Sequence, residues 1–392
     1  MGASTRLELP PPSPEAAAHS ARVRERIAVE IEAAGGAIPF RRYMELALYA
    51  PGLGYYMAGT EKLGPGGDFV TAPEVSPLFA ACLARQVAEV LERLGGGEVL
   101  ELGAGSGRLA AGLLAALERL GAAPARYRIL EVSGELAARQ RAHLAAALPA
   151  WRERIVWARG LPEAGFRGVV IANEVLDAMP VERFERTAEG VVELGVRRRG
   201  EGFAWTALPP AEDLAAAVAG IEAACGRLPA GYRSERNPQL AGWVAALGEI
   251  LEAGVVLLVD YGYPRCEYYH PERADGTLRC HYRHRAHDDP FLLPGIQDIT
   301  AHVDFTAVAE AAVAAGLEVA GYTTQAQFLL ATGLAELAAE AADALTRARR
   351  AAEVKRLVMP SEMGEAFKVM ALARGIEGPL GGFALRDLRG RL

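Results

Sequence analysis

The sequence predicts an α/β fold in which a doubly wound, mostly parallel sheet carries helices on both faces. Two observations lead to this prediction. Short apolar segments typical of buried parallel strands alternate along the chain with longer segments of helical character. One of these strands, at 99–102, turns through closely spaced glycines directly into a helix that begins near Arg108. Such folds bind ligands beyond the carboxyl ends of their strands, so functional residues are expected there.

Composition limits the class of protein. The chain has 392 residues, 51% of them hydrophobic, which is enough to bury a large core in one domain with insertions or in two domains. Its formal net charge of -7 argues against nucleic acid as a partner, because phosphate binding needs a basic surface. Its cysteines form no CxxC pair and suggest no disulfide framework, which fits a reducing compartment. Because neither a targeting segment nor a long apolar segment is evident, we expect a cytoplasmic protein without membrane insertion.

The amino-terminal part is predicted to be mainly helical. Residues 1–20 are rich in proline and alanine and are expected to form a flexible tail. Helical patterns follow at 22–34, 40–48 and 77–94, and Ser76 is expected to cap the last of these helices, with Pro77 as its first residue.

The elements after the glycine turn alternate between strand and helix. Antiparallel pairing is expected only at 181–208, where apolar and polar residues alternate around turn residues. A polar insertion occupies 262–300. The other strands are expected at 127–133, 154–157, 168–172, 255–261, 317–322 and 366–371, and the other helices at 237–253 and 305–315.

The glycine turn is the strongest local signal. Gly103, Gly105 and Gly107 permit backbone angles and a close ligand approach that a Cβ atom would forbid. The helix that follows points free backbone amides at the turn. The spacing Gly-x-Gly-x-Gly differs from the dinucleotide fingerprint Gly-x-Gly-x-x-Gly, which weakens an NAD interpretation. A turn that serves only packing is the alternative.

Acidic residues occupy the ends of the neighbouring strands. Glu131 ends the strand after the glycine turn, close to the offset of about 20 residues at which an acid meets ribose hydroxyls in dinucleotide-binding folds. Asn173, Glu174 and Asp177 follow the strand at 168–172, and Asp260 ends the strand at 255–261. An ordinary solvated glutamate at 131, and a helix cap formed by Asn173 or Asp177, are the alternatives.

The polar insertion gathers histidines together with cysteines and acids. Zinc binding is conceivable, but no pair has a zinc-ribbon spacing, and we expect no metal. A substrate lid whose neutral imidazoles accept a proton is the preferred interpretation, and surface histidines bonded to loop carbonyls are the alternative. The histidines within or beside the insertion are His270, His281, His284, His287 and His302.

Five separated blocks of sequence together resemble the MidA-type S-adenosylmethionine (SAM) methyltransferases, a family that includes a mitochondrial assembly factor for respiratory complex I. The blocks occur in the family's order at 67–76, 101–107, 173–180, 259–262 and 297–305. The resemblance implies a class I methyltransferase fold, Rossmann-like, with a seven-stranded sheet. It also implies a helical cap at 21–95 and a methyltransferase domain at 96–392, with insertions at about 181–250 and 262–300.

The resemblance implies SAM as the cofactor and an arginine of a partner protein as the methyl acceptor. Glu174 and Asp177 are the candidates for holding the guanidinium, because paired carboxylates bind its planar fork. Asp298 and His302 are further catalytic candidates, since they lie in a family-like block. The cofactor candidates are Thr71, Pro73, Glu74, Glu101, Gly103, Ala104, Gly105, Gly107, Glu131 and Asn173.

The identity of the acceptor stays open at this stage. A respiratory-complex subunit is the protein substrate that the resemblance suggests, and a homodimer is a further expectation. Two alternatives compete with protein methylation. The first is a SAM enzyme that acts on a small molecule, and the second is a non-catalytic assembly factor that retains SAM binding.

Overall fold

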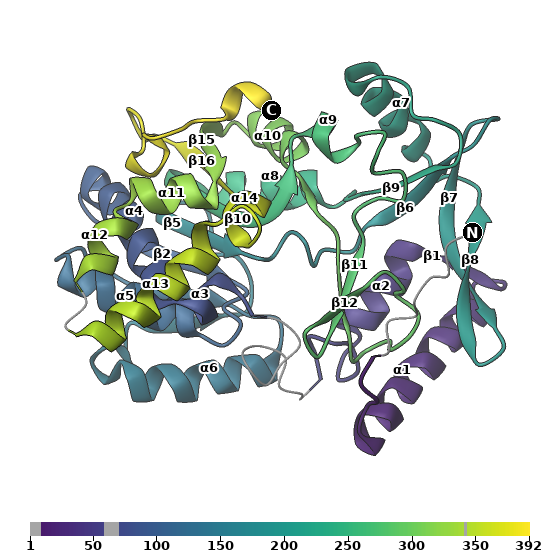
Figure 1. Ribbon diagram of the computed structural model, residues 1–392, viewed down its shortest axis with the longest axis horizontal. Helices are drawn as coiled ribbons and strands as arrows, with labels where there is room; N and C mark the ends of the chain where they lie inside the picture. Colours follow the sequence, from purple (N-terminus) through teal and green to yellow (C-terminus); the bar gives the residue numbers. More distant parts are fainter. Residues whose placement is uncertain (1–8, 59–69, 341–342) are drawn as a thin grey trace. The chain divides into compact units, whose positions relative to one another are not determined.

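The computed structural model describes residues 9–58, 70–340 and 343–392, and the chain divides into two compact units (Figure 1). The expected tail at 1–20 and the block at 67–76 therefore lie partly outside the described residues. The first unit comprises Met1–Val70, Ala178–Pro238 and Cys266–His302, and the second comprises Thr71–Asp177, Gln239–Arg265 and Val303–Leu392.

This division differs from the expected cap and methyltransferase domain. Helix α4 (Pro77–Leu94) was expected in the cap, but its buried residues, among them Phe79 and Leu83, join the core of the second unit. Helix α8 (Leu240–Ile250) was expected in the first insertion, but it packs on helix α10 (Phe305–Ala314) and belongs to the second unit as well. Tertiary packing, which local periodicity does not report, determines both assignments.

The second unit is built on a sheet with the strand order β15-β16-β10-β5-β2-β3-β4, and the short strand β14 (Val303–Asp304) pairs with β10. The strands from β10 to β4 are parallel, whereas β16 is antiparallel to both of its neighbours. The α/β prediction and the seven strands along the path are thus confirmed. Their bounds are β2 (Glu98–Leu102), β3 (Tyr127–Leu130), β4 (Ile155–Ala158), β5 (Phe166–Asn173), β10 (Leu251–Tyr263), β15 (Glu318–Thr324) and β16 (Phe367–Arg374).

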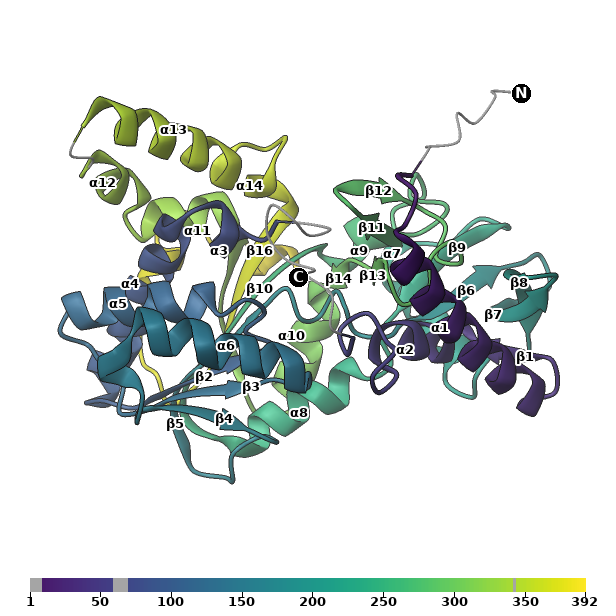
Figure 2. The same cartoon turned by 90° about the horizontal axis from the view of Figure 1, so that it is seen from below.

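Helices flank this sheet, as Figure 2 shows. Helix α4 packs on α5 and on β5, and α8 packs on α10 and on β10. Central strand residues such as Val169, Ile171 and Leu257 are completely buried, as expected for strands covered on both faces. The remaining helices are α3 (Ala72–Val75), α5 (Arg108–Arg119), α6 (Gly134–Ala147), α11 (Gln325–Ala331), α12 (Leu334–Ala339), α13 (Ala344–Val358) and α14 (Met363–Ala366).

The first unit is an antiparallel sheet with helices and a small second sheet. Its main sheet has the order β1-β7-β6-β9, with β8 paired to β7, and the antiparallel prediction for 181–208 is confirmed. The polar insertion forms the sheet β12-β11-β13. The bounds are α1 (Pro14–Ala33), β1 (Ala37–Pro39), α2 (Phe40–Tyr49), β6 (Glu182–Arg186), β7 (Val191–Arg199), β8 (Gly202–Leu208), α7 (Leu214–Cys225), β9 (Tyr232–Arg236), β11 (Arg279–Tyr282), β12 (Arg285–His287) and β13 (Asp298–Thr300).

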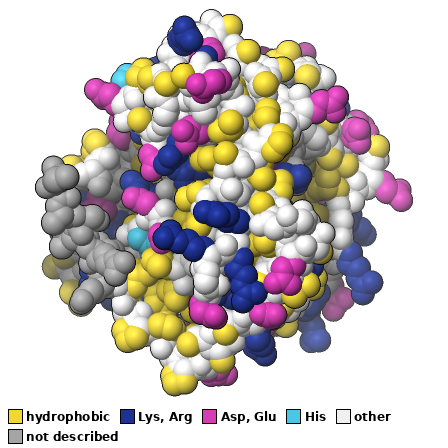
Figure 3. All heavy atoms as spheres, turned by 90° about the vertical axis from the view of Figure 1, so that its right-hand side faces the viewer, with side chains coloured by type: hydrophobic (Ala, Val, Ile, Leu, Met, Phe, Trp, Pro, Cys, Tyr) yellow, Lys and Arg dark blue, Asp and Glu magenta, His cyan; other side chains and the backbone are white. Residues whose placement is uncertain are grey.

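Helix α1 begins within the expected flexible tail. Ser13 caps it by accepting a hydrogen bond from the Ala16 amide at 3.2 Å, and Pro14 is its first residue. Ser13 and Pro14 lie within the proline-rich tail that the sequence predicts, although together they are a helix-start signal. Within the described residues, no helix is both long and apolar enough to cross a bilayer. On the face in Figure 3, acidic, basic and hydrophobic side chains are interspersed, as is typical of a solvated surface.

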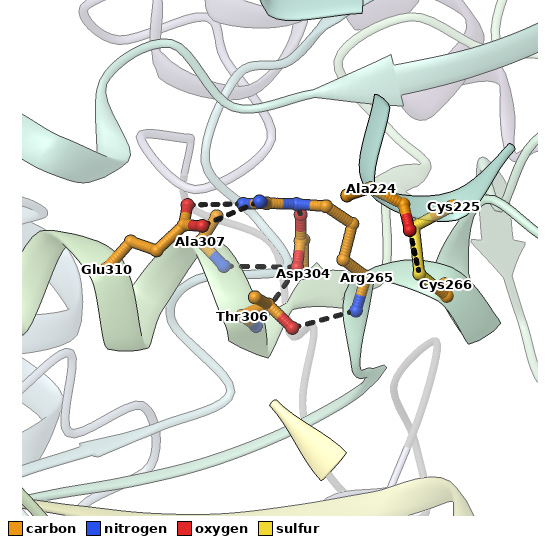
Figure 4. Close-up of a disulfide and its surroundings, with 8 residues drawn as sticks. All are labelled: Ala224, Cys225, Arg265, Cys266, Asp304, Thr306, Ala307 and Glu310. Carbon is orange, nitrogen blue, oxygen red and sulfur yellow. Dashed lines mark hydrogen bonds and ion pairs between the residues drawn. A yellow bond between two sulfur atoms is a disulfide. The ribbon is translucent and has the colours of Figure 1, made fainter. Parts of the chain in front are cut away.

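A disulfide corrects the expectation that the cysteines provide no disulfide framework. Cys225, at the end of α7, is joined to Cys266, in helix α9 (Arg265–Tyr268), and both belong to the first unit (Figure 4). The two residues are 41 positions apart in the sequence, yet their Cα atoms lie 5.0 Å apart. Sequence spacing cannot reveal such a pair, because only the fold brings the two cysteines together.

Candidate active site

The glycine turn follows β2 and leads into α5. Gly103, Gly105 and Gly107 have φ values of 66°, 53° and 82°, in the left-handed region that favours glycine. A Cβ atom on Gly107 would meet its nearest neighbour, a His143 carbon, at 3.5 Å, which is an ordinary contact. The requirement for glycine at this position is therefore conformational, and the turn delivers the amino-terminal amides of α5 to the end of β2.

Strand register places the predicted polar residues beside this turn. Leu102 of β2 pairs with Leu130 of β3 on one side and with Ala172 of β5 on the other. The residues that follow these positions, Glu131 and Asn173, therefore flank Gly103 at the carboxyl edge of the sheet. This is the edge at which open α/β sheets bind their ligands.

Glu131 is tied to the glycine turn through a residue that sequence reasoning missed. Its carboxylate accepts hydrogen bonds from the Ser133 amide and from the Gln140 side chain, both at 2.9 Å. Gln140, on α6, also donates to the Gly105 carbonyl at 3.0 Å and accepts from the Trp157 indole at 3.0 Å. A fully buried glutamine that bridges two motif residues is recognisable only from the tertiary structure.

Glu101 lies buried just before the turn. Burial raises the pKa of its carboxyl to about 7, a hydrogen bond from the Tyr127 hydroxyl at 2.7 Å opposes this rise, and the negative charge of Glu131 adds to it. The surroundings thus favour the neutral acid. A positive charge placed near Glu101 would favour its ionised form.

Strand β5 ends at Asn173, and the next residue, Glu174, has an unusual backbone conformation. Glu174 has a φ of 53°, which is rare for a residue other than glycine, and its amide donates to the Val259 carbonyl at 2.8 Å. The side-chain nitrogen Nδ2 of Asn173 donates to the Glu174 carboxylate at 3.1 Å. In the part of the chain that the structure describes, the buried Oδ1 of Asn173 has no hydrogen-bond partner.

The residues after Glu174 are held by the neighbouring strand and cap no helix. Residues 174–180 are all described and form turns and bends, which excludes the helix-cap alternative for Asn173 and Asp177. Instead, the Asp260 carboxylate accepts hydrogen bonds from the amides of Leu176 at 3.0 Å and Asp177 at 3.2 Å. The sequence places Asp260 at a strand end but does not indicate this role.

Helix α3 carries the predicted cofactor cover. Thr71 is its N-cap residue, and Pro73 lies in its first turn. Glu74 accepts a hydrogen bond from the Ser106 hydroxyl and forms an ion pair with Arg108, with 2.9 Å between Nε and Oε2. Glu74 therefore fastens α3 to the glycine turn and the start of α5. The predicted cap at Ser76 is confirmed, because its hydroxyl accepts from the Leu78 amide at 3.1 Å.

Asp298 and His302, the other catalytic candidates, belong to the first unit. Asp298 begins β13 and accepts hydrogen bonds from the Tyr56 hydroxyl at 2.8 Å and from the Ile299 amide at 3.0 Å. The His302 amide donates to the Thr277 hydroxyl at 3.1 Å. Across residues 9–58, 70–340 and 343–392, no group of three or more His, Cys, Asp or Glu side chains is arranged to hold a metal ion.

Comparison with known proteins identifies related chains. A family model described as S-adenosyl-L-methionine-dependent methyltransferase matches residues 82–323. A Burkholderia thailandensis protein, solved bound to S-adenosyl-homocysteine, is 48% identical, with a TM-score of 0.94 over 98% of this chain and 100% of that chain. The mitochondrial protein arginine methyltransferase NDUFAF7 homolog of Drosophila melanogaster is 28% identical over 95% of this chain and 90% of its own. The Mus musculus NDUFAF7 is 29% identical over 86% and 81%.

These comparisons overturn the prediction of a cytoplasmic protein. The curated relatives from fly, mouse and zebrafish are named as mitochondrial proteins. The cytoplasmic prediction was inferred only from the lack of an evident targeting segment and from cysteine spacing. The names of the relatives are stronger evidence than either observation. The argument from cysteine spacing is also wrong, because Cys225 and Cys266 form a disulfide.

Proposed function

Because the chain belongs to the family of S-adenosyl-L-methionine-dependent methyltransferases, we propose that it methylates an arginine side chain of a partner protein. The cofactor of this family is SAM, and the similar Burkholderia thailandensis protein holds the demethylated product of SAM. The arginine acceptor is supported by the curated relatives, which are named protein arginine methyltransferases. A respiratory-complex subunit as the partner, and a homodimer as the assembly, remain parts of this proposal.

The residues at the carboxyl edge of the sheet fit SAM. Its hydroxyls and amines need acceptors, and the Asn173 Oδ1 atom is a buried acceptor without a partner among the described residues. Glu101 is buried directly before the glycine turn, and a positively charged group bound near it would favour its ionised form. The proposed contacts are Glu131 for the ribose, Glu101 and Asn173 for polar groups, and the backbone of Gly103, Ala104, Gly105 and Gly107 for close approach. Thr71, Pro73 and Glu74 are proposed to cover the site.

Glu174 and Asp177 are proposed to hold the guanidinium of the acceptor. A guanidinium arrives charged, because its pKa lies above about 12, and its nitrogen lone pairs are delocalised. Two carboxylates bind its planar fork and concentrate the positive charge on the bound nitrogens, which leaves another nitrogen freer to attack. When bound, SAM supplies a methyl group on a positively charged sulfur, and holding the two reactants in line contributes about 7–11 kcal/mol.

This proposal rests on two features that lie at the same edge of the sheet in the second unit. The glycine turn with Glu131 lies at the ends of β2 and β3, and the carboxyls of Glu174 and Asp177 follow the adjacent strand β5. We assign the chemistry to these two acids. Asp298 and His302 stay predictions of the sequence.

Substitution of the two acids tests the proposal. Glu174→Gln and Asp177→Asn remove a negative charge each and are expected to lower methyl transfer to protein by about 100-fold, while the affinity for SAM stays at the wild-type value. Glu163→Gln is the matched control, because Glu163 is exposed and precedes the opposite end of β5. Transfer is measured with tritiated-methyl SAM, and SAM binding is measured by calorimetry. Wild-type rates in both acid variants would contradict the assignment.

A further inference from the structure

We infer that Asp260 and Tyr261 are positioning residues that fix the 174–177 turn and orient the Asp177 carboxylate, an inference that rests on the proposed methyl transfer. The sequence places Asp260 at a strand end and Tyr261 in a family-like block, but it assigns neither residue this role. Both lie at the end of β10, and β10 pairs with β5 up to the register Val259 to Asn173. The two strands therefore deliver Asp260 and Glu174 to the same edge of the sheet. Positioning matters there, because a displacement of about 1 Å in a catalytic group costs about 100-fold in rate.

The backbone amides of Leu176 and Asp177 belong to no helix, and the Asp260 side chain accepts their hydrogen bonds. It is only 1% exposed, and one carboxylate oxygen accepts from the amides of Leu176 and Asp177. The other oxygen accepts from the Tyr261 amide at 2.9 Å. Buried amides without an acceptor are costly, so the Asp260 side chain determines where the backbone at 176 and 177 can lie.

Strand β10 also holds the strained residue of the turn. The φ of Glu174, 53°, lies in the left-handed region, which is unfavourable for a residue with a Cβ atom. Such a conformation persists only where the surroundings determine it. Here the Glu174 amide is bound to the Val259 carbonyl at 2.8 Å, directly before Asp260 in the chain. Two successive residues of β10 thus hold the two ends of the 174–177 turn.

Tyr261 adds a hydrogen bond between side chains to this network. Its hydroxyl donates a hydrogen bond to Oδ2 of Asp177, and its ring packs edge-on against Phe367, with 5.3 Å between the ring centroids. The packed ring limits where the hydroxyl can lie. This hydrogen bond selects one orientation of the Asp177 carboxylate.

The charges around Asp260 explain why a cationic acceptor suits this edge. Burial raises the pKa of Asp260, and the negative charges of Asp177 and Glu174 raise it further. Lys368 of β16 pairs with Asp260 in the sheet register, and its ammonium group donates to the carbonyls of Glu365 and Ala366. A guanidinium held by Glu174 and Asp177 would relieve the repulsion among the three acids.

Tyr261→Phe tests the inference while preserving the ring. Methyl transfer is measured with tritiated-methyl SAM and protein from a lysate of cells that lack the gene. We expect the maximal rate to fall about tenfold, with an unchanged KM for SAM. The control is Tyr322→Phe, which removes the hydroxyl of another fully buried tyrosine, on β15 of the same sheet.

Asp260→Asn provides an arm that does not depend on activity. Hydrogen exchange of the amides at 176 and 177, followed by mass spectrometry, is expected to accelerate about tenfold or more in this variant and to stay at the wild-type rate in Tyr322→Phe. The inference is overturned if Tyr261→Phe keeps the wild-type maximal rate, or if Asp260→Asn leaves the exchange unchanged. If the wild-type enzyme labels no protein, the proposed function is contradicted instead. The hydrogen-exchange measurement would still decide whether Asp260 holds the turn.

Discussion

Glu101 is the residue whose titration links the fold to the cofactor site. Its pKa is raised from the ordinary value of 4.5 to about 7, so the folded chain binds this proton more tightly than the unfolded chain does. The stability that this proton contributes is fully present below about pH 4.5 and is lost as the pH rises through 7. The shift corresponds to about 3 kcal/mol in the free energy of unfolding.

Glu101→Gln should remove this dependence. Relative to the variant, the wild-type protein is expected to lose about 3 kcal/mol of unfolding free energy between pH 4.5 and pH 8. Urea unfolding at several pH values measures this difference. The wild-type affinity for SAM should rise over the same range, because the ionised carboxylate attracts the positive charge of the cofactor, whereas the affinity of the variant should stay flat. Parallel pH profiles for the two proteins would refute the burial argument.

Gly107 tests the conformational requirement of the turn. Its φ of 82° strains any side chain, although the nearest neighbour leaves room for a Cβ atom. Gly107→Ala should therefore lower the unfolding free energy by about 1–2 kcal/mol and also weaken SAM binding. Gly121→Ala is the matched control, because Gly121 has a φ of 68° and open space around it, but lies after the far end of α5. It should lose similar stability and keep its SAM affinity in calorimetry. Equal SAM affinity in both variants would contradict a role of the turn in binding.

At the scale of elements, the disulfide is the clearest testable contribution to the first unit. It joins the end of α7 to α9 across 41 residues, and closing a loop of that size stabilises a fold by about 4 kcal/mol in the chain-entropy treatment. Reductant should therefore lower the melting temperature of the wild-type protein. It should have no effect on the Cys225→Ser/Cys266→Ser double variant, which is expected to melt at the temperature of the reduced wild-type protein. Equal melting with and without reductant in the wild type would show that the bond contributes nothing.

Element prediction from the sequence succeeded where the signal is local. The apolar segments at 99–102 and 168–172 have the composition of buried parallel strands, and the glycines at 103–107 mark the end of the first one. Both strands could therefore be predicted from the sequence. The start of β10 at Leu251 was missed, because Leu251–Gly254 continues the apolar character of the preceding helix. Helix and strand cannot be distinguished by periodicity in a short apolar segment.

At the scale of the whole molecule, the division into units could not be predicted. Three separate segments of the sequence form the first unit, and the contacts that join them are long-range. The same limit applies to the site. The sequence predicts that Glu131, Glu174 and Asp260 lie at strand ends on one edge of the sheet, and their roles stay predictions. The hydrogen-bond partners of Gln140 and Asp260 are distant in sequence and are seen only in the fold.

The central claim is that this SAM-dependent methyltransferase modifies an arginine of a partner protein. Its most direct test is to incubate the purified protein and tritiated-methyl SAM with a lysate of cells that lack the gene, and to identify any labelled protein by mass spectrometry. We predict a single labelled protein whose tryptic peptide carries methylated arginine, and we predict about 100-fold less of this label with Glu174→Gln. Label confined to low-molecular-mass compounds, or SAM binding without any transfer, would contradict the claim.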